Sequence, residues 1–546
     1  MRRRAPTALL SGLLAATALL TAAGCGDDAE RARRGGTAVI GGYVDLRTMN
    51  PLHTTPDIAK ALQRYALYTP LLVFDSAQRP QPRLAERWDT VRVAPDTLEL
   101  TFHLRGDVAW HDGTPVTSRD VAFTFELARD PRTPYVDAAA LAPYAPRAET
   151  PDARTVRVRL RAHPDFLEPW FLLPPLPRHV LADVPPEQVA QHPFSSSPLG
   201  SGPFRFVRRA PGSEWVFEAN PDFPAALGGR PHLDRLVYRT IPEQTGLITE
   251  LLTGRIDMAL SIRPAQVATL LESDEVRVLE LPIANWIFLA FNTRLPFFDT
   301  REERRALALA IDRQAIVDGI MGGRNVVGRS VVTPVHRAFD STSAALGQPR
   351  ADTARARALL EQAGWRDRDG DGIREDSAGN PFRFPLMVWQ GSGSYQEIAQ
   401  VIQAQLRQVG VAADVRVVEF NTFVAQIQGN GGRGPREFAA AIGNWTDNLR
   451  KDDAQLFHSR NATGPRFWTG FSSPRTDSLI DALALELDPA RSRALWQEYQ
   501  HAVVEDAPLV VLFYARGING VRRALRGLAE DWRGPLASVQ EWWIDE

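Results

Sequence analysis

The fold is decided by one stretch of sequence in which apolar runs of two kinds alternate. It reads FPLMVW at residues 384–389, IAQVIQAQLRQV at 398–409, VAADVRVV at 411–418 and FAAAI at 438–442. The first, third and fourth runs are short and densely apolar, as buried strands are, whereas the second spaces its apolar residues as a helix does. The order strand, helix, strand, strand predicts an α/β fold.

The same alternation extends toward the amino terminus. Residues 37–43 are strand-like, and residues 286–291 form a continuous apolar run typical of a strand covered on both faces. Residues 98–104 place an apolar side chain at every second position, which predicts a half-buried strand. Thr117 with Asp120 predicts one helix start, and Thr300 with Glu303 forms the capping box of another.

Three further segments complete the prediction of structure. Residues 256–260 are predicted to form a buried strand, and residues 352–363 a helix that ends at Gly364. Residues 164–193 are rich in proline and are expected to run irregularly over the surface.

Length and charge exclude several classes of protein. The chain has 546 residues, more than one hydrophobic core supports, so two or more lobes are expected. Removing residues 1–24 takes away three arginines and leaves a formal charge of −5. This net charge gives no indication of the basic surface that binds nucleic acid. Past residue 25 no apolar run is long enough to span a membrane. Lys60 and Lys451 are the only lysines, which we interpret as a bias of composition.

The amino terminus predicts the cellular location. Arg2, Arg3 and Arg4 precede a short apolar run at residues 8–20, and small residues lead to Cys25, the only cysteine. This is the pattern of a secretory signal, here residues 1–24. Its junction resembles the lipobox of bacterial lipoproteins, in which the thiol is acylated; the alternative is a plain signal peptide with an incidental cysteine. Residues 25–36 would then tether the body to a membrane, with no intramolecular disulfide.

Two motifs that imitate functional sites are better explained by turns and loops. Residues 429–434 fit GxGxxG, but they follow a helical stretch and precede Pro435. A dinucleotide site needs this motif after a strand and at the start of a helix, whose amino terminus binds the pyrophosphate. Residues 429–434 do not meet this requirement. Residues 367–372 imitate an EF-hand loop, but Ala378 stands where a bidentate glutamate should close the calcium shell. A turn stabilised by its aspartates is favoured over a calcium site, so no metal or cofactor is expected.

The strongest candidate for a binding site follows the strand at 438–442. Asn444, Trp445 and Asp447 lie at its carboxyl end, where α/β sheets place ligands, and Trp389 ends a neighbouring strand. A buried aspartate there could pair with an amine, with tryptophan as an apolar wall. The alternative is that Asp447 only caps a helix that begins at Asn448.

Motifs along nearly the whole chain resemble those of the family 5 extracellular solute-binding proteins, the oligopeptide and dipeptide receptors of ABC importers. In chain order they are residues 84–88, 102–108, 111–117, 120–121, 200–204, 254–258, 291–293, 306–313 and 363–365. The resemblance implies two α/β lobes of the periplasmic-binding-protein type, joined by a hinge, with an extra subdomain in the first lobe. It places the first lobe at 37–288, the second at 289–514, and the return to the first at 515–546.

The same resemblance implies a mechanism. Ligand enters the open cleft, the hinge closes, and the closed form docks on a membrane permease. In peptide-binding members an aspartate after a Gly-Trp strand end pairs with the α-amine of the ligand, which here points to Asp447. Tyr43, Val44 and Asp45 are the expected opposite wall.

The expected protein is a monomeric, lipid-anchored peptide receptor of the cell envelope that faces the periplasm or the exterior. With the same fold, an oligosaccharide, a nickel chelate or haem would be the alternative ligand, because the ligand is determined by the residues of the site and not by the fold. From other classes, a secreted hydrolase or a non-transport interaction protein would be the alternative. The chain has no recognisable nucleophile or metal constellation, so an enzyme is not expected.

Overall fold

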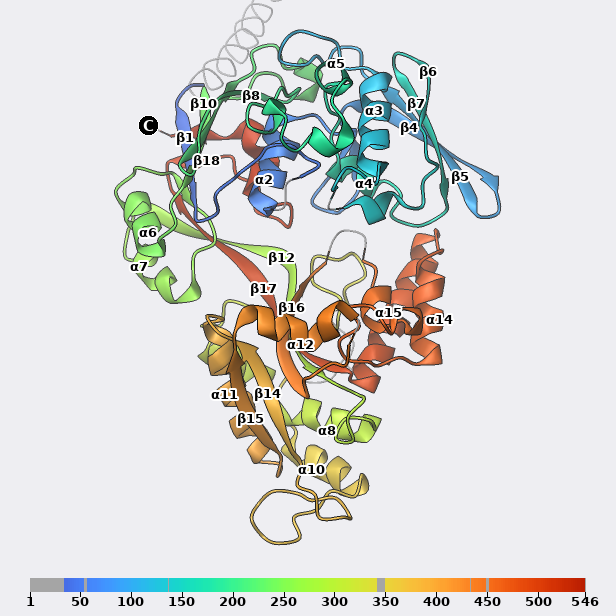
Figure 1. Cartoon of the computed structure of the whole chain (residues 1–546). Helices are drawn as coiled ribbons and strands as arrows, with labels where there is room; N and C mark the ends of the chain where they lie inside the picture. Colours follow the sequence, from blue (N-terminus) through green and yellow to red (C-terminus); the bar gives the residue numbers. More distant parts are fainter. Residues whose placement is uncertain are drawn as a thin grey trace, which may run out of the picture.

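Two α/β lobes make up the protein, shown one above the other in Figure 1. The computed structural model describes residues 34–53, 56–135, 137–340, 349–432, 434–447 and 451–545. The predicted signal peptide, Cys25 and most of the predicted tether lie outside these residues. Within them, no helix has the length and apolar character needed to cross a membrane.

One mixed sheet runs through both lobes in the order β15-β14-β16-β12-β17-β11-β1-β10-β9-β8, and β13 pairs with β17. Its strands are β1 (Thr37–Gly42), β8 (Phe204–Ala210), β9 (Glu214–Ala219), β10 (Arg235–Thr240), β11 (Met258–Ala259), β12 (Val276–Phe291), β13 (Val326–Val327), β14 (Arg383–Trp389), β15 (Ala412–Val418), β16 (Ala440–Thr446) and β17 (Leu509–Arg522). β14 is parallel to β15 and β16, and β12 is antiparallel to β16 and β17.

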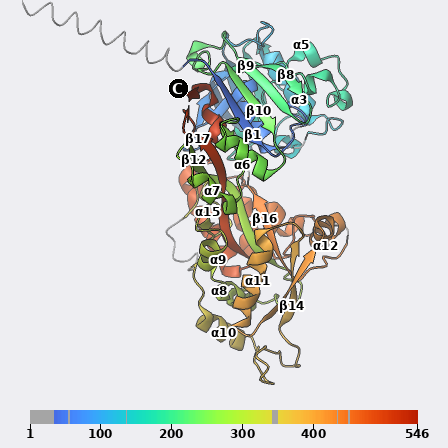
Figure 2. The same ribbon diagram turned by 90° about the vertical axis from the view of Figure 1, so that its left-hand side faces the viewer.

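Strands β12 and β17 connect the lobes, and Figure 2 shows both passing from the upper lobe to the lower one. Residues 276–282 of β12 pair with residues 516–522 of β17 on the side of the first lobe. The register then shifts between Pro282 and Trp286, after which β12 pairs with residues 509–514 on the side of the second lobe. β12 and β17 thus carry the chain between the lobes, which also touch through an ion pair between Arg337 and Asp165. The exact bounds of the lobes stay a prediction.

A separate four-stranded sheet belongs to the first lobe, as an extra subdomain. Its order is β4-β5-β7-β6, formed by β4 (Ala85–Ala94), β5 (Thr97–Leu104), β6 (Glu149–Asp152) and β7 (Thr155–Arg161). Every second residue of β5 is buried, which confirms the predicted half-buried strand. Helix α3 (Ser118–Arg129) packs beside it and begins at the predicted start, with a capping box in which the Thr117 amide donates to Asp120 Oδ2 at 2.8 Å.

The blocks at 111–117 and 200–204 are brought together by packing. The His111 amide donates to the carbonyl of Gly200 at 2.9 Å, and the His111 ring reaches the carbonyl of Gly202 at 3.0 Å. A Cβ on Gly200 would lie 2.0 Å from the carbonyl oxygen of Leu67. Only glycine fits this close approach of two backbones.

Helices cover both faces of the sheet in the second lobe, and successive residues of β12 alternate between two cores. Ile287 and Leu289 face the core shared with α8 (Arg301–Ala310), α9 (Arg313–Gly319), α10 (Thr353–Gln362) and α11 (Ser394–Arg407). Trp286 and Phe288 face the core shared with α14 (Pro474–Leu483) and α15 (Pro489–Asp506). This confirms a strand covered on both faces. The predicted capping box of α8 is also present, with the Thr300 amide donating to Glu303 at 3.2 Å.

The structure corrects three predictions of secondary structure. β12 begins ten residues before the predicted run, at Val276, and the strand expected at 256–260 is reduced to β11. The segment 164–193 is not a surface excursion: it forms α4 (Glu168–Leu172) and α5 (Arg178–Leu181) and buries large side chains. Trp170 stacks on Phe125 with ring centres 5.3 Å apart, so aromatic packing holds this proline-rich segment inside the subdomain.

Candidate ligand-binding site between the lobes

A cleft of about 940 Å³ lies between the two lobes. The first lobe lines it with Asp137, Ala140, Glu168 and Leu172. The second lobe lines it with Asn444, Trp445, Thr446, Asp447, Asp452, Gln455, Asn461, Gly464, Pro465 and Arg466. Its volume is at the upper end of the range of about 300–1,000 Å³ that is usual for ligand pockets. The amide, carboxylate and aromatic groups of this lining are suited to holding a polar chain by hydrogen bonds and apolar contact.

The second-lobe wall is built by the carboxyl end of β16. Pairing with β12 places Trp445 opposite Trp286, and the Asp447 amide donates to the carbonyl of Ala284 at 2.7 Å. Asn444 is exposed to the cleft, and the Trp445 ring is half-buried. The Arg466 guanidinium lies 5.2 Å from the centre of that ring, within the range of a cation–π contact. The sequence-predicted residues Asn444, Trp445 and Asp447 therefore lie on one wall of one cleft.

Asp447 already has a cationic partner inside the protein. Its Oδ1 accepts a hydrogen bond from Lys451 Nζ at 2.9 Å, and the same ammonium donates to Asp453 Oδ1 at 2.9 Å. Asp453 Oδ2 accepts in turn from the hydroxyl of Tyr499 at 2.7 Å. The Lys451 side chain is fully buried and that of Asp447 is 5% exposed. The other proposed role of Asp447, capping a helix from Asn448, concerns residues that lie outside the described part of the chain.

The charges of this buried triad do not balance, because two carboxylates share one ammonium. Burial raises the pKa of Asp447 to about 6; the charge of Lys451 opposes this rise and the charge of Asp453 adds to it. Burial alone would lower the pKa of Lys451, but the charges of Asp447 and Asp453 outweigh it and raise that pKa above its ordinary value. A fully ionised triad carries a net charge of −1.

The first-lobe wall also pairs a carboxylate with a lysine. Asp137 Oδ2 accepts from Lys60 Nζ at 3.2 Å, with both side chains 29% exposed. Lys60 lies on α2 (Asp57–Leu62), and Glu168, on α4, is buried at the edge of the cleft. The two lysines of the chain therefore each hold an aspartate that lines the cleft, one in each lobe.

Four predicted site residues are not among the described residues that line this cleft. The Trp389 ring, at the end of β14, packs against Tyr395 and Phe423 with ring centres 4.9 and 5.0 Å away. On the other lobe, Tyr43 is 50% exposed, and the carbonyl of Val44 accepts from the hydroxyl of Tyr238 at 2.7 Å. The Trp389 ring is thus taken up by packing, and the loop after β1 is tied at the backbone of Val44. Binding roles for Trp389 and for Tyr43, Val44 and Asp45 stay a prediction.

Sequence reasoning missed Lys451, Asp453 and Tyr499 on the second-lobe wall, and Asp137 and Glu168 on the first. Tyr499 is 46 residues from Asp453 in the chain, so no local pattern connects them. Lys451 carried the one available signal, since it is a lysine in a chain whose other basic residues, Lys60 apart, are arginines.

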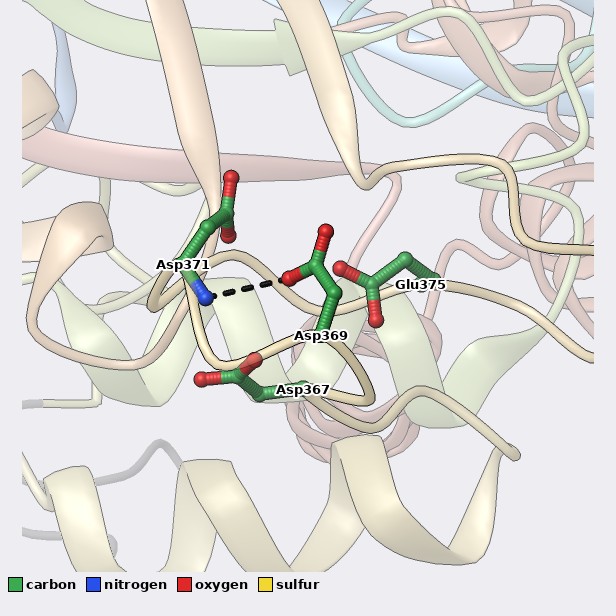
Figure 3. Close-up of side chains that lie close together, drawn as sticks. All are labelled: Asp367, Asp369, Asp371 and Glu375. Atoms are coloured by element: carbon green, nitrogen blue, oxygen red, sulfur yellow. Dashed lines mark hydrogen bonds between the residues drawn. The ribbon is translucent and has the colours of Figure 1, made fainter.

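The acidic loop after α10 forms the predicted turn. One carboxylate oxygen from each of Asp367, Asp369, Asp371 and Glu375 lies within 4.8 Å of the other three. Figure 3 shows these four side chains close together on the loop. Asp367 Oδ1 accepts from the Gly370 amide at 2.8 Å, and Asp369 Oδ1 accepts from the Asp371 amide at 3.0 Å. These bonds confirm the aspartate-stabilised turn. The loop lies at the end of the second lobe remote from the first (Figure 1), so its carboxylates take no part in the cleft.

Comparison with known proteins agrees with this architecture. Residues 79–466 match the family described as bacterial extracellular solute-binding proteins, family 5 middle. The chain is 24% identical over 564 residues, covering 100% of both chains, to the oligopeptide-binding protein AppA of Bacillus subtilis. It is 29% identical over 460 residues, or 82% of this chain and 81% of the relative, to a putative ABC transporter peptide-binding protein of Brucella ovis.

A solved structure shares the whole fold. That of the ABC transporter substrate-binding protein CtaP from Listeria monocytogenes matches with a TM-score of 0.80 at 21% identity, over 94% of this chain and 100% of the other. The family match covers well over half of the chain and confirms the resemblance drawn from the motifs. This is a family of solute-binding receptors, and the protein belongs to it: it is a family 5 bacterial extracellular solute-binding protein.

Proposed function

We propose that the protein captures peptides in the cleft between its lobes and delivers them to an ABC-type importer. The observation that carries this proposal is a cleft whose two walls belong to different lobes, between which the chain passes in β12 and β17. A ligand that touches both walls interacts more strongly with a closed arrangement than with an open one, and so favours closure. The names of the relatives from Bacillus subtilis and Brucella ovis support peptide as the ligand.

The chemistry of the second-lobe wall suits an extended peptide. The side chains of Asn444, Thr446, Gln455 and Asn461 offer amide and hydroxyl groups that can satisfy backbone N–H and C=O groups of a bound chain. Recognition through the backbone tolerates varied side chains. The half-buried ring of Trp445 provides an apolar surface for one of these side chains.

We further propose that Cys25 carries a lipid that anchors the receptor to a membrane, facing the periplasm or the cell exterior. The apolar run that ends at this cysteine supports the proposal, and diacylated anchors give stable attachment. The receptor is proposed to act as a monomer without catalytic activity. Mass spectrometry of the protein extracted from membranes tests the anchor, because an unmodified Cys25 would refute it.

A thermal-shift screen tests the ligand. The chain without residues 1–24 is unfolded and refolded to remove carried ligand, then heated with peptides of different length, cello- and malto-oligosaccharides, nickel chelates or haem. A ligand at about 100 times its dissociation constant stabilises the folded state by about 2.7 kcal/mol. Stabilisation by peptides alone is expected. A response only to sugars, chelates or haem would replace the function and keep the fold.

Two tryptophans provide a matched pair of variants for this screen. Trp445 and Trp389 both lie at strand ends, but only Trp445 lines the cleft. Trp445→Ala is expected to weaken peptide binding about tenfold or more, since loss of one buried aromatic contact costs about 1.5 kcal/mol or more. Trp389→Ala should leave peptide affinity within about twofold of the wild type. Equal losses in both variants would contradict the cleft as the peptide site.

A further inference from the structure

The ammonium group of Lys451 occupies a complete cation site in the second-lobe wall. Its Nζ lies 2.9 Å from Asp447 Oδ1 and 2.9 Å from Asp453 Oδ1, and 5.6 Å from the centre of the Trp286 ring. Two of its N–H donors are thus bound by carboxylates, and the ring lies within the range of a cation–π contact. Asp453 is fixed from behind by the hydroxyl of Tyr499. The site holds a primary ammonium, which is also the group at the amino terminus of a free peptide.

A ligand amine has little access to these carboxylates. The Lys451 side chain is 0% exposed and the Asp447 side chain 5% exposed, and the second oxygen of Asp447, Oδ2, is buried as well. A competing amine would have to displace a group that is covalently tethered beside the site and therefore present at a high effective concentration. It would also leave the buried Lys451 charge with Asp453 as its one remaining carboxylate partner, which is costly.

Composition supports a specific role for the lysine at this position. Of the 63 basic residues in the chain, 61 are arginines, and both lysines hold an aspartate of the cleft. A bias toward arginine explains why lysine is rare, but it does not explain where the two lysines lie. A compact ammonium fits between two carboxylates only 2.9 Å from each, where a planar guanidinium presents a different geometry.

We propose that Lys451 fills the amine site of the second-lobe wall from within, so that this receptor binds peptides whether or not they carry a free α-amino group. The inference rests on the proposed function and makes its ligand class more specific. Peptides with blocked amino termini and internal segments of longer peptides would bind as well as short free peptides. The role expected for Asp447 from the family resemblance, pairing with a ligand amine, is in this chain taken by Lys451.

Calorimetric titration of the refolded wild type with one peptide and its N-acetylated copy tests the proposal directly. The two dissociation constants are expected to agree within about threefold. If Asp447 were the partner of the ligand amine, loss of one charge-assisted bond would weaken the acetylated copy by about tenfold or more. A tenfold preference for the free peptide would therefore overturn the inference while keeping the function. Binding of neither form would refute the function and the inference together.

Substitution of Lys451 should create a preference for peptides with a free amino terminus over their acetylated copies. Lys451→Met removes the internal ammonium, and the vacated site is expected to make the free peptide bind about tenfold or more tighter than the acetylated copy. Lys60→Met is the matched control, since it removes the other lysine of the cleft, which pairs with the single carboxylate of Asp137 and not with two, and it should leave the ratio unchanged. An unchanged ratio in folded Lys451→Met would overturn the inference.

Asp447→Asn keeps the inference testable if Lys451→Met does not fold. Lys451 retains Asp453 in this variant, and the ratio between free and acetylated peptide is expected to stay at the wild-type value. A loss of affinity confined to the free peptide would show that Asp447 binds the ligand amine, and would overturn the inference.

Discussion

Asp447→Asn tests the electrostatics of the buried triad through the pH dependence of stability. Burial raises the pKa of Asp447 to about 6 in the folded protein, against about 3.9 in an unfolded chain. Between about pH 4 and 6 the folded chain therefore holds a proton that the unfolded chain has lost. The free energy of unfolding contributed by this group falls as the pH rises through that window, and a shift of about two pKa units corresponds to about 3 kcal/mol.

Asparagine has nearly the shape of the protonated carboxyl group and cannot ionise, and Lys451 keeps its bond to Asp453. We expect the variant to match the wild type at about pH 4 and to be more stable by up to about 3 kcal/mol at about pH 7. If about 510 residues unfold in one transition, this difference corresponds to a rise in Tm of about 3 °C.

The assay is urea unfolding of wild type and variant at several pH values between about 4 and 7. Asp452→Asn is the control, because it removes an exposed carboxylate from the same segment without touching the triad. The reasoning is refuted if the difference in unfolding free energy between wild type and Asp447→Asn is independent of pH. It is also refuted if the variant is the less stable protein at about pH 7.

Three other substitutions, one of them with a control variant, probe the triad and the packing. Lys451→Met should lower the free energy of unfolding by about 3–5 kcal/mol at neutral pH and by less in acid, measured in the same titrations, because it leaves two buried carboxylates without a cation. Gly200→Ala should cost about 1–3 kcal/mol, because its Cβ would meet a carbonyl oxygen at 2.0 Å. Gly246→Ala, whose Cβ meets nothing nearer than 3.6 Å in a helix, is its control and should be neutral or stabilising. Phe513→Ala should cost about 3–5 kcal/mol by opening a cavity between sheet and helices in the second lobe, and a smaller loss in thermal unfolding would contradict that packing.

Elements with a local signature could be predicted from the sequence. The helices that begin after Thr117 and Thr300 have their capping boxes, and β5 has its alternation, because each of these patterns is set by residues three or fewer positions apart. The first half of β12 was missed, since residues 276–282 mix charged and apolar side chains at the point where the strand changes lobes. The helices in residues 164–193 were missed because aromatic packing, which acts across the subdomain, overrides the prolines.

The candidate site could be predicted on one wall only. The rule that ligands gather at the carboxyl ends of strands pointed to Asn444, Trp445 and Asp447, which line the cleft. The same rule pointed to Trp389, whose ring packs instead beneath α12 (Phe420–Gly432). The direction of a side chain at a strand end depends on tertiary contacts, and so does the identity of the distant residue that it meets. No local pattern in the sequence encodes these contacts. Lys451 and Tyr499 join the site through such contacts, so the sequence did not predict them.

The passage of β12 and β17 between the lobes also sets the order in which the chain can fold. The core of the first lobe includes Ala38 from one end of the chain and Trp542 from the other, whereas the second lobe is built from one continuous stretch between β12 and β17. A chain that emerges amino terminus first can therefore complete its second lobe, including residues 509–514 of β17, while the first still lacks residues 516–522 of β17 and the segment that carries Trp542. Residues 516–522 of β17 then join the sheet beside β11 and β12, so the core of the first lobe is completed only after the second lobe has been made.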